Sequence, residues 1–102
     1  MKTFLSIVLA MAMVTPGQAQ VADAEEGRGL AQQLCAECHA VRPDESRSPK
    51  TGAPTFPQLA AASGMTATAL TVALTTPHAG MPMFRLTPQQ RADVIAYILS
   101  LR

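Results

Sequence analysis

The 102-residue sequence has few of the large side chains from which a small protein builds a core. It contains no tryptophan, one tyrosine and three phenylalanines, and one phenylalanine lies in the N-terminal apolar run. The aromatic residues that remain are Phe56, Phe84 and Tyr97. The length suits one domain, and a domain so poor in large apolar side chains is hard to stabilise by its own packing. We therefore expect a bound group to complete the core.

The sequence also lacks an excess of charge of either sign. Its formal net charge is +1, with eight Lys and Arg residues against seven Asp and Glu. Without residues 1–19 both counts are seven, because Lys2 is lost. This balance argues against nucleic acid or an anionic membrane as the main partner. No segment alternates apolar and polar residues as a strand does, so we expect an all-α fold.

The N-terminus has the features of an export signal. An apolar run of eleven residues, Phe4–Val14, follows Lys2, whereas a helix needs about 20 residues to cross a bilayer. Proline, glycine and small residues come next, as at a signal-peptidase site. We predict that residues 1–19 are a secretory signal peptide cleaved after Ala19, and that residues 20–102 form one periplasmic domain without stable membrane insertion. The alternative is an uncleaved N-terminal anchor.

The two cysteines of the chain, Cys35 and Cys38, lie only three positions apart. Export permits a disulfide, but a bond between these two would close a very small loop and constrain little of the unfolded chain. A thioredoxin-like redox motif needs a βαβ setting that is not present. A zinc site needs more ligands than two thiols and His39, and the one further histidine is His78.

The histidine that follows the second cysteine points to another chemistry. Cys35-Ala36-Glu37-Cys38-His39 is a Cys-x-x-Cys-His sequence, the attachment signal for covalent haem. Positions i, i+3 and i+4 share one face of a helix, so Cys35, Cys38 and His39 can address one porphyrin together. We predict one covalently bound haem c, with thioethers from both cysteines and His39 as the proximal iron ligand.

Helical spacing and capping residues predict three helices. The first spans Asp23–Cys38, and its first turn is acidic. The second begins after Thr66 and ends at Thr76, before a proline. The last begins after Thr87, where a Thr-Pro-Gln-Gln sequence predicts a capping box. Proline, serine, glycine and basic residues predict a loop over residues 41–57.

Two features of this loop bear on the haem. Pro54 fixes the backbone at a point where a carbonyl could accept the ring N–H of His39, as a metal-bound histidine requires; the alternative is an ordinary turn proline. Arg42, Arg47 and Lys50 are expected to be solvated loop charges. The functional alternative is that one of them neutralises a haem propionate.

Three side chains compete for the distal position on the iron. His78, Met81 and Met83 all lie in one loop rich in glycine and proline, between the second and last predicted helices. A methionine often only fills a gap in the core, but two thioethers in such a loop suggest ligation. A thioether ligand favours Fe(II) and raises the reduction potential, whereas a second imidazole from His78 would lower it.

Taken together, these features resemble the class I c-type cytochromes over about residues 24–102. The residues that carry the resemblance are Gly27, Cys35-Ala36-Glu37-Cys38-His39, Gly52-Ala53-Pro54, Met81-Pro82 and Asp93-Val94-Ile95-Ala96-Tyr97. The resemblance implies a small cytochrome c-like fold, in which three to four short helices wrap around one covalently bound haem. It also implies that the first and last helices cross.

The resemblance also implies roles for single residues. Gly27 and Tyr97 would meet where the two helices cross, and Met81 would be the distal ligand, with Met83 in reserve. Two departures stand out. Ala31 stands where many members have an aromatic residue, which implies a smaller contact area between the first and last helices. Lys50 is the only lysine in residues 20–102, so docking through a ring of lysines is not carried over.

The function that follows is one-electron transfer by a soluble monohaem carrier, without enzymatic activity of its own. Its partners would be redox proteins: a dehydrogenase or reductase as donor, and an oxidase or another acceptor. One alternative is a haem c subunit permanently bound to a periplasmic dehydrogenase. Another is catalysis or gas binding at an open iron, against which Met81 argues.

Overall fold

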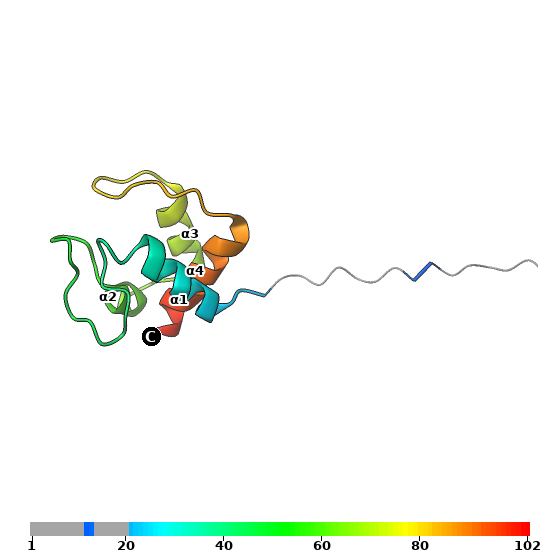
Figure 1. Ribbon diagram of the computed structural model, residues 1–102, viewed down its shortest axis with the longest axis horizontal. Coiled ribbons are helices and arrows are strands. Elements are labelled where there is room, and N and C mark those ends of the chain that lie inside the picture. The colour runs from blue at the N-terminus through cyan, green and yellow to red at the C-terminus, as the bar shows by residue number, and fades with distance from the viewer. Residues whose placement is uncertain (1–11, 14–20) are drawn as a thin grey trace, which may run out of the picture.

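The computed structural model describes residues 12–13 and 21–102. The helices of this part are α1 (Ala24–Leu34), α2 (Phe56–Ala61), α3 (Ala67–Thr75) and α4 (Pro88–Ser100), and it contains no strand (Figure 1). The predicted all-α fold with three to four short helices is confirmed. The predicted signal peptide, residues 1–19, lies outside the described residues except for 12–13. None of the described helices is long and apolar enough to cross a membrane.

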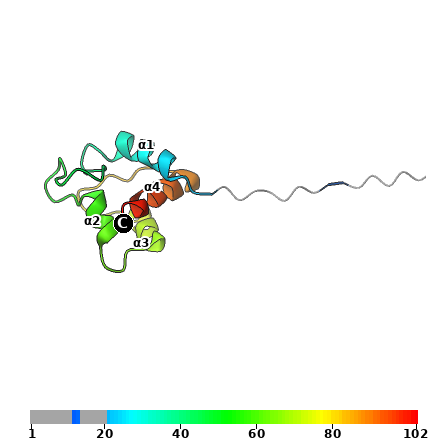
Figure 2. The same ribbon diagram turned by 90° about the horizontal axis from the view of Figure 1, so that it is seen from below.

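Helices α1 and α4 form the most extensive helix contact of the described chain, and they lie across each other in Figures 1 and 2. Gly27 is buried at this contact, and a Cβ atom there would overlap the backbone carbonyl of Asp93. Ala31, one turn further along α1, is fully buried. Small residues at both positions therefore let the two helix backbones approach closely.

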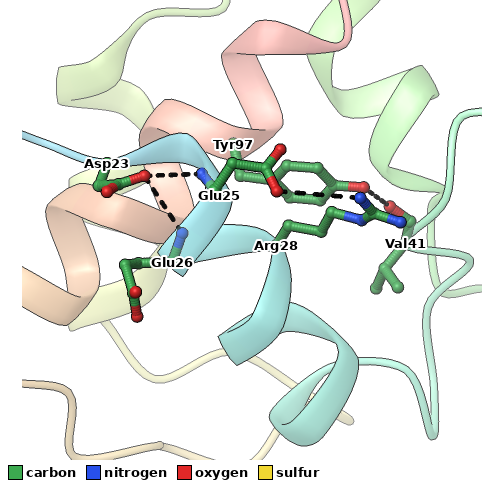
Figure 3. Close-up of polar contacts among 6 residues, drawn as sticks. All are labelled: Asp23, Glu25, Glu26, Arg28, Val41 and Tyr97. Carbon is green, nitrogen blue, oxygen red and sulfur yellow. Dashed lines mark hydrogen bonds and ion pairs between the residues drawn. The ribbon is translucent and has the colours of Figure 1, made fainter.

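Gly27 faces the backbone of α4. The three heavy atoms nearest to a Cβ at Gly27 belong to the backbone of Asp93 and Val94. Tyr97 lies one turn later in α4, where it is buried and its hydroxyl donates to the carbonyl of Val41 at 2.5 Å (Figure 3). The ring thus anchors the chain segment that follows the cysteines. Burial raises the pKa of Tyr97, which keeps the hydroxyl protonated as a donor.

Asp23 caps α1 and lies one position before its first residue, whereas the prediction had Asp23 inside the helix. Its side-chain Oδ1 accepts hydrogen bonds from the backbone N–H groups of Glu25 at 2.9 Å and Glu26 at 3.3 Å (Figure 3). These bonds satisfy donors that have no partner within the helix. The N–H of Asp23 itself donates to the buried carboxylate of Asp93 at 2.8 Å. The start of α1 is therefore tied to α4 as well as capped.

The first helix is shorter than the prediction of Asp23–Cys38, because α1 ends at Leu34. The N–H of Cys35 still reaches the carbonyl of Ala31 at 2.9 Å, but the N–H of Ala36 reaches the same carbonyl at 3.1 Å. One acceptor shared by two successive donors ends the regular i to i−4 ladder, as at many helix C-termini. The cysteines therefore follow the helix instead of belonging to it.

Helix α2 lies partly inside the segment predicted as a loop over residues 41–57. Thr55 accepts from the N–H of Gln58 at 3.1 Å, and the side chain of Gln58 accepts from the N–H of Thr55 at 2.9 Å. This capping box has the same chemistry as the one between Thr87 and Gln90 that begins α4. The predicted loop is wrong at residues 56–57, because the cap at Thr55 begins a helix despite the neighbouring prolines.

The core gathers around α4, which packs against each of the other three helices. Its buried members come from all four helices and from the segment after the cysteines. They are Ala31, Val41, Phe56, Ala60, Leu70, Val94, Ile95, Tyr97 and Ile98. Most of these side chains are small or medium in size, so the core is thin.

Substitution of Gly27 tests the close approach of α1 and α4. Gly27→Ala should lower the free energy of unfolding by about 1–3 kcal/mol, because the added methyl group must push the helices apart. Gly29→Ala is the matched control: apart from its chain neighbours and its own helix backbone, nothing lies within 4 Å of its Cβ position, and alanine should stabilise the helix by about 0.5–1 kcal/mol. Denaturant unfolding measures both, and equal effects would contradict the proposed role of Gly27.

Candidate functional site

The two cysteines and the histidine that follows them lie in a single turn directly after α1. The carbonyl of Cys35 accepts from the N–H of Cys38 at 3.1 Å and from that of His39 at 2.9 Å. This turn keeps the i, i+3, i+4 relation beyond the end of the helix. Both cysteines are free thiols and partly buried. The three side chains are thus grouped as the sequence predicted.

All three line a cavity of about 440 Å³. Its volume is within the range of about 300–1,000 Å³ that small-molecule and cofactor sites occupy. The walls are mostly apolar and come from every helix and from both long loops. They include Leu34, Phe56, Leu59, Leu70, Val94 and Ile98. Side chains of the thin core therefore surround a space that they do not fill.

His39 is held by a hydrogen bond across 15 residues. Its ring Nδ1 lies 2.6 Å from the backbone carbonyl oxygen of Pro54. Because a carbonyl only accepts, Nδ1 carries the hydrogen, and the lone pair of the neutral ring is then on Nε2. A histidine arranged in this way can donate Nε2 to a metal ion while the second bond fixes its orientation.

Phe56 is a part of the site that the sequence analysis missed. Its ring centroid lies 5.6 Å from that of His39 and 6.3 Å from that of Tyr97. Phe56 therefore lies between the imidazole of His39 and the Tyr97 ring of α4, and it restricts rotation of the imidazole. The signal in the sequence was the capping box that begins at Thr55, because it places Phe56 at the buried start of a helix.

The loop before α4 separates its two methionines. Met81 lines the cavity together with His78, whereas Met83 is 50% exposed and is not among the lining residues. The Nε2 atom of His78 lies 3.0 Å from the sulfur of Met81. Gly80, between them, has φ of +80°, a conformation that glycine adopts without strain. Of the three candidates for the distal position, the structure brings His78 and Met81 to the cavity.

Lys50 connects the two long loops beside the cavity. Its backbone N–H donates to the carbonyl of Cys38 at 3.1 Å, and its ammonium group donates to the carbonyl of Gly80 at 2.6 Å. Of the other basic residues considered, Arg42 forms an exposed ion pair with Glu45 at 3.9 Å, which contributes little. Lys50 thus holds the loop of Met81 next to the cysteine-containing turn.

Burial raises the pKa of the Cys35 thiol, and the nearby Cys38 raises it further. A thiol with a raised pKa stays neutral, whereas a metal ligand must be a thiolate. Within residues 12–13 and 21–102, no group of three or more His, Cys, Asp or Glu side chains could hold a metal ion. The Cys35 sulfur is therefore partly withdrawn from solvent within the cavity wall.

Comparison with known proteins agrees with this geometry. The family model for cytochrome c matches residues 24–102. The chain belongs to the cytochrome c family. It is 35% identical over 98 residues to cytochrome c-552 of Bradyrhizobium diazoefficiens, an alignment that spans 96% of this chain and 92% of that protein. No solved structure matches the chain. The predicted family is therefore confirmed over nearly the whole described domain.

Membership of the cytochrome c family implies one covalently bound haem c and a role as an electron carrier. The site fits this group in its chemistry. Cys35 and Cys38 lie in one turn for two thioether bonds, and His39 is oriented as a ligand by Pro54. The cavity walls are mostly apolar, as a porphyrin ring requires.

Loss of both attachment cysteines should leave the chain without a stable fold. At about 24 cal/mol per Å³, an unfilled 440 Å³ cavity costs at most about 10 kcal/mol, which is comparable to the whole stability of a small domain, about 5–15 kcal/mol. Cys35→Ser/Cys38→Ser should therefore lose most helical signal in far-UV circular dichroism. Glu37→Ser, within the same motif, should keep it. A cooperative, helix-rich double variant would contradict this expectation.

Proposed function

We propose that this cytochrome c carries single electrons in the periplasm, with His39 and Met81 as the axial ligands of its haem iron. When bound, the haem supplies one-electron chemistry between Fe(II) and Fe(III). The observation that carries the proposal is the 2.6 Å hydrogen bond from His39 Nδ1 to Pro54. That bond leaves Nε2 as the donor atom of a ring that lines the cavity.

The proximal side is built for a ligand that stays in place. Donation of the Nδ1 hydrogen to a carbonyl makes Nε2 more basic and fixes the ring orientation. The ring centroid of Phe56 lies 5.6 Å from that of the imidazole. A ligand held by both contacts changes position little between oxidation states, as electron transfer requires.

Met81 is the proposed distal ligand because its sulfur-bearing side chain lines the same cavity as His39. Met83, its competitor, lies at the surface with half of its area exposed. A thioether is a softer ligand than an imidazole and favours Fe(II), so it raises the reduction potential. The apolar walls act in the same direction, because a low-dielectric setting disfavours the extra charge of Fe(III).

The partners we propose are redox proteins: a dehydrogenase or reductase that gives an electron, and an oxidase or other acceptor that takes it. The chain from residue 20 onward carries equal numbers of acidic and basic side chains and a single lysine, Lys50. Such a surface offers no strong electrostatic steering. We therefore propose weak, transient docking through a small apolar contact near the haem edge.

Substitution of Met81 tests the distal ligand. Met81→Ala should abolish the weak long-wavelength charge-transfer band of a thioether bound to Fe(III), and it should lower the reduction potential, because a soft ligand is lost. Met83→Leu is the matched control and should retain both properties. An optical redox titration of the purified holoproteins reports both. Persistence of the band in Met81→Ala would exclude Met81 as the ligand.

Purification of the native protein tests whether it is periplasmic and whether it exists free of a dehydrogenase complex. A periplasmic extract should contain a haem-bearing chain that begins at Gln20, as mass spectrometry can show. In size-exclusion chromatography this chain should elute at the size of a single small domain. Co-elution with a dehydrogenase would instead identify a permanent subunit, and a retained residue 1–19 segment would contradict the cleaved signal.

A further inference from the structure

His78 has the orientation of a metal ligand. Its Nδ1 atom lies 3.2 Å from the backbone carbonyl oxygen of Thr76, and its Nε2 atom lies 3.0 Å from the sulfur of Met81. The carbonyl can only accept, so Nδ1 carries the hydrogen and the neutral ring has its lone pair on Nε2. Nε2 of His78 and the thioether sulfur of Met81 therefore lie side by side, and both residues line the cavity.

The same arrangement occurs at His39. There Nδ1 donates to the carbonyl of Pro54, which leaves Nε2 free. A histidine that binds a metal almost always gives its other ring hydrogen to a carbonyl, a carboxylate or water. Each of the two histidines of the chain therefore has a backbone carbonyl that orients it, and each lines the same cavity.

A tight turn keeps His78 next to Met81. The N–H of Met81 lies 3.4 Å from the carbonyl oxygen of His78, and Gly80 at the third position has φ of +80°. Four-residue turns of this kind bring their first and last residues close together. Prolines on both sides of the turn, Pro77 and Pro82, restrict its backbone. The ammonium group of Lys50 holds the turn at the Gly80 carbonyl.

We propose that His78 is a second distal ligand, which binds the haem iron through Nε2 whenever the thioether of Met81 leaves it. The inference rests on the proposed function, because it takes Met81 as the resting ligand. On loss of the Met81 sulfur, Nε2 of His78 would take its place in holding the iron. Both donors are neutral and each contributes one electron pair, so no proton or electron is gained or lost.

The exchange has a functional consequence. Imidazole in place of thioether lowers the reduction potential, so the protein would pass from a high-potential to a low-potential form. The iron would keep six ligands in both forms. His78 would thereby prevent small molecules from binding an open iron after loss of the thioether.

Ferric spin state is the measurement that tests this inference, because it depends on the distal ligand and not on electron-transfer activity. Met81→Ala holoprotein should lose the thioether band yet remain low-spin in electron paramagnetic resonance, with a lower potential than the parent. Met81→Ala/His78→Ala should lose the low-spin signal and become high-spin. Met81→Ala/Met83→Leu is the matched control and should match Met81→Ala. Met81→Leu, which nearly conserves volume, replaces Met81→Ala if that variant does not fold.

The outcomes separate this inference from the proposed function. A high-spin Met81→Ala protein would overturn the role of His78 and leave Met81 as the resting ligand. A low-spin double variant would also overturn it, because another side chain would then bind. A parent protein without a thioether band, whose low-spin signal is lost in His78→Ala, would overturn both the proposed ligation and this inference. Retention of the band in His78→Ala supports Met81 as the resting ligand.

Discussion

The close approach of α1 and α4 is the constraint on which the other parts of the domain depend. Gly27 lies against the backbone of Asp93, and Ala31 is fully buried one turn later. The contact fixes where α1 ends and so where the cysteine-containing turn begins. It also directs Val94 and Ile98 of α4 into the wall of the haem cavity. A larger side chain at Gly27 would move both the attachment point and the opposite wall.

A few hydrogen bonds hold the long loops around the cavity. Tyr97 donates to Val41, which ties the segment after the cysteines to α4. Pro54 accepts from His39, and Lys50 bonds to both Cys38 and Gly80. Each bond joins a segment of irregular chain to a residue near the cavity. The loops therefore contribute to the site through a few polar contacts, while apolar side chains supply the volume.

The sequence predicted the helices well where a cap and an apolar face agreed. Thr66 and Thr87 begin α3 and α4 as expected, and Asp23 caps α1. The prediction failed where two signals competed. Helical spacing predicts that the cysteine segment continues α1, and the Thr55–Gln58 cap lies in a segment whose prolines predict a loop. Local composition cannot decide such cases, because the shared carbonyl of Ala31 and the burial of Phe56 both depend on contacts in the folded chain.

The residues of the site also differ in whether the sequence alone predicts their place. The sequence by itself predicted the attachment chemistry, because Cys35, Cys38 and His39 are neighbours along the chain, and one turn of backbone brings them together. It also determined the family, now confirmed over residues 24–102. Only the tertiary structure decided that Met81 and His78 line the cavity while Met83 lies exposed at the surface. All three residues are close in sequence, and each has a side chain that can bind iron. The path of the loop, held by Gly80 and Lys50, separates Met83 from the other two.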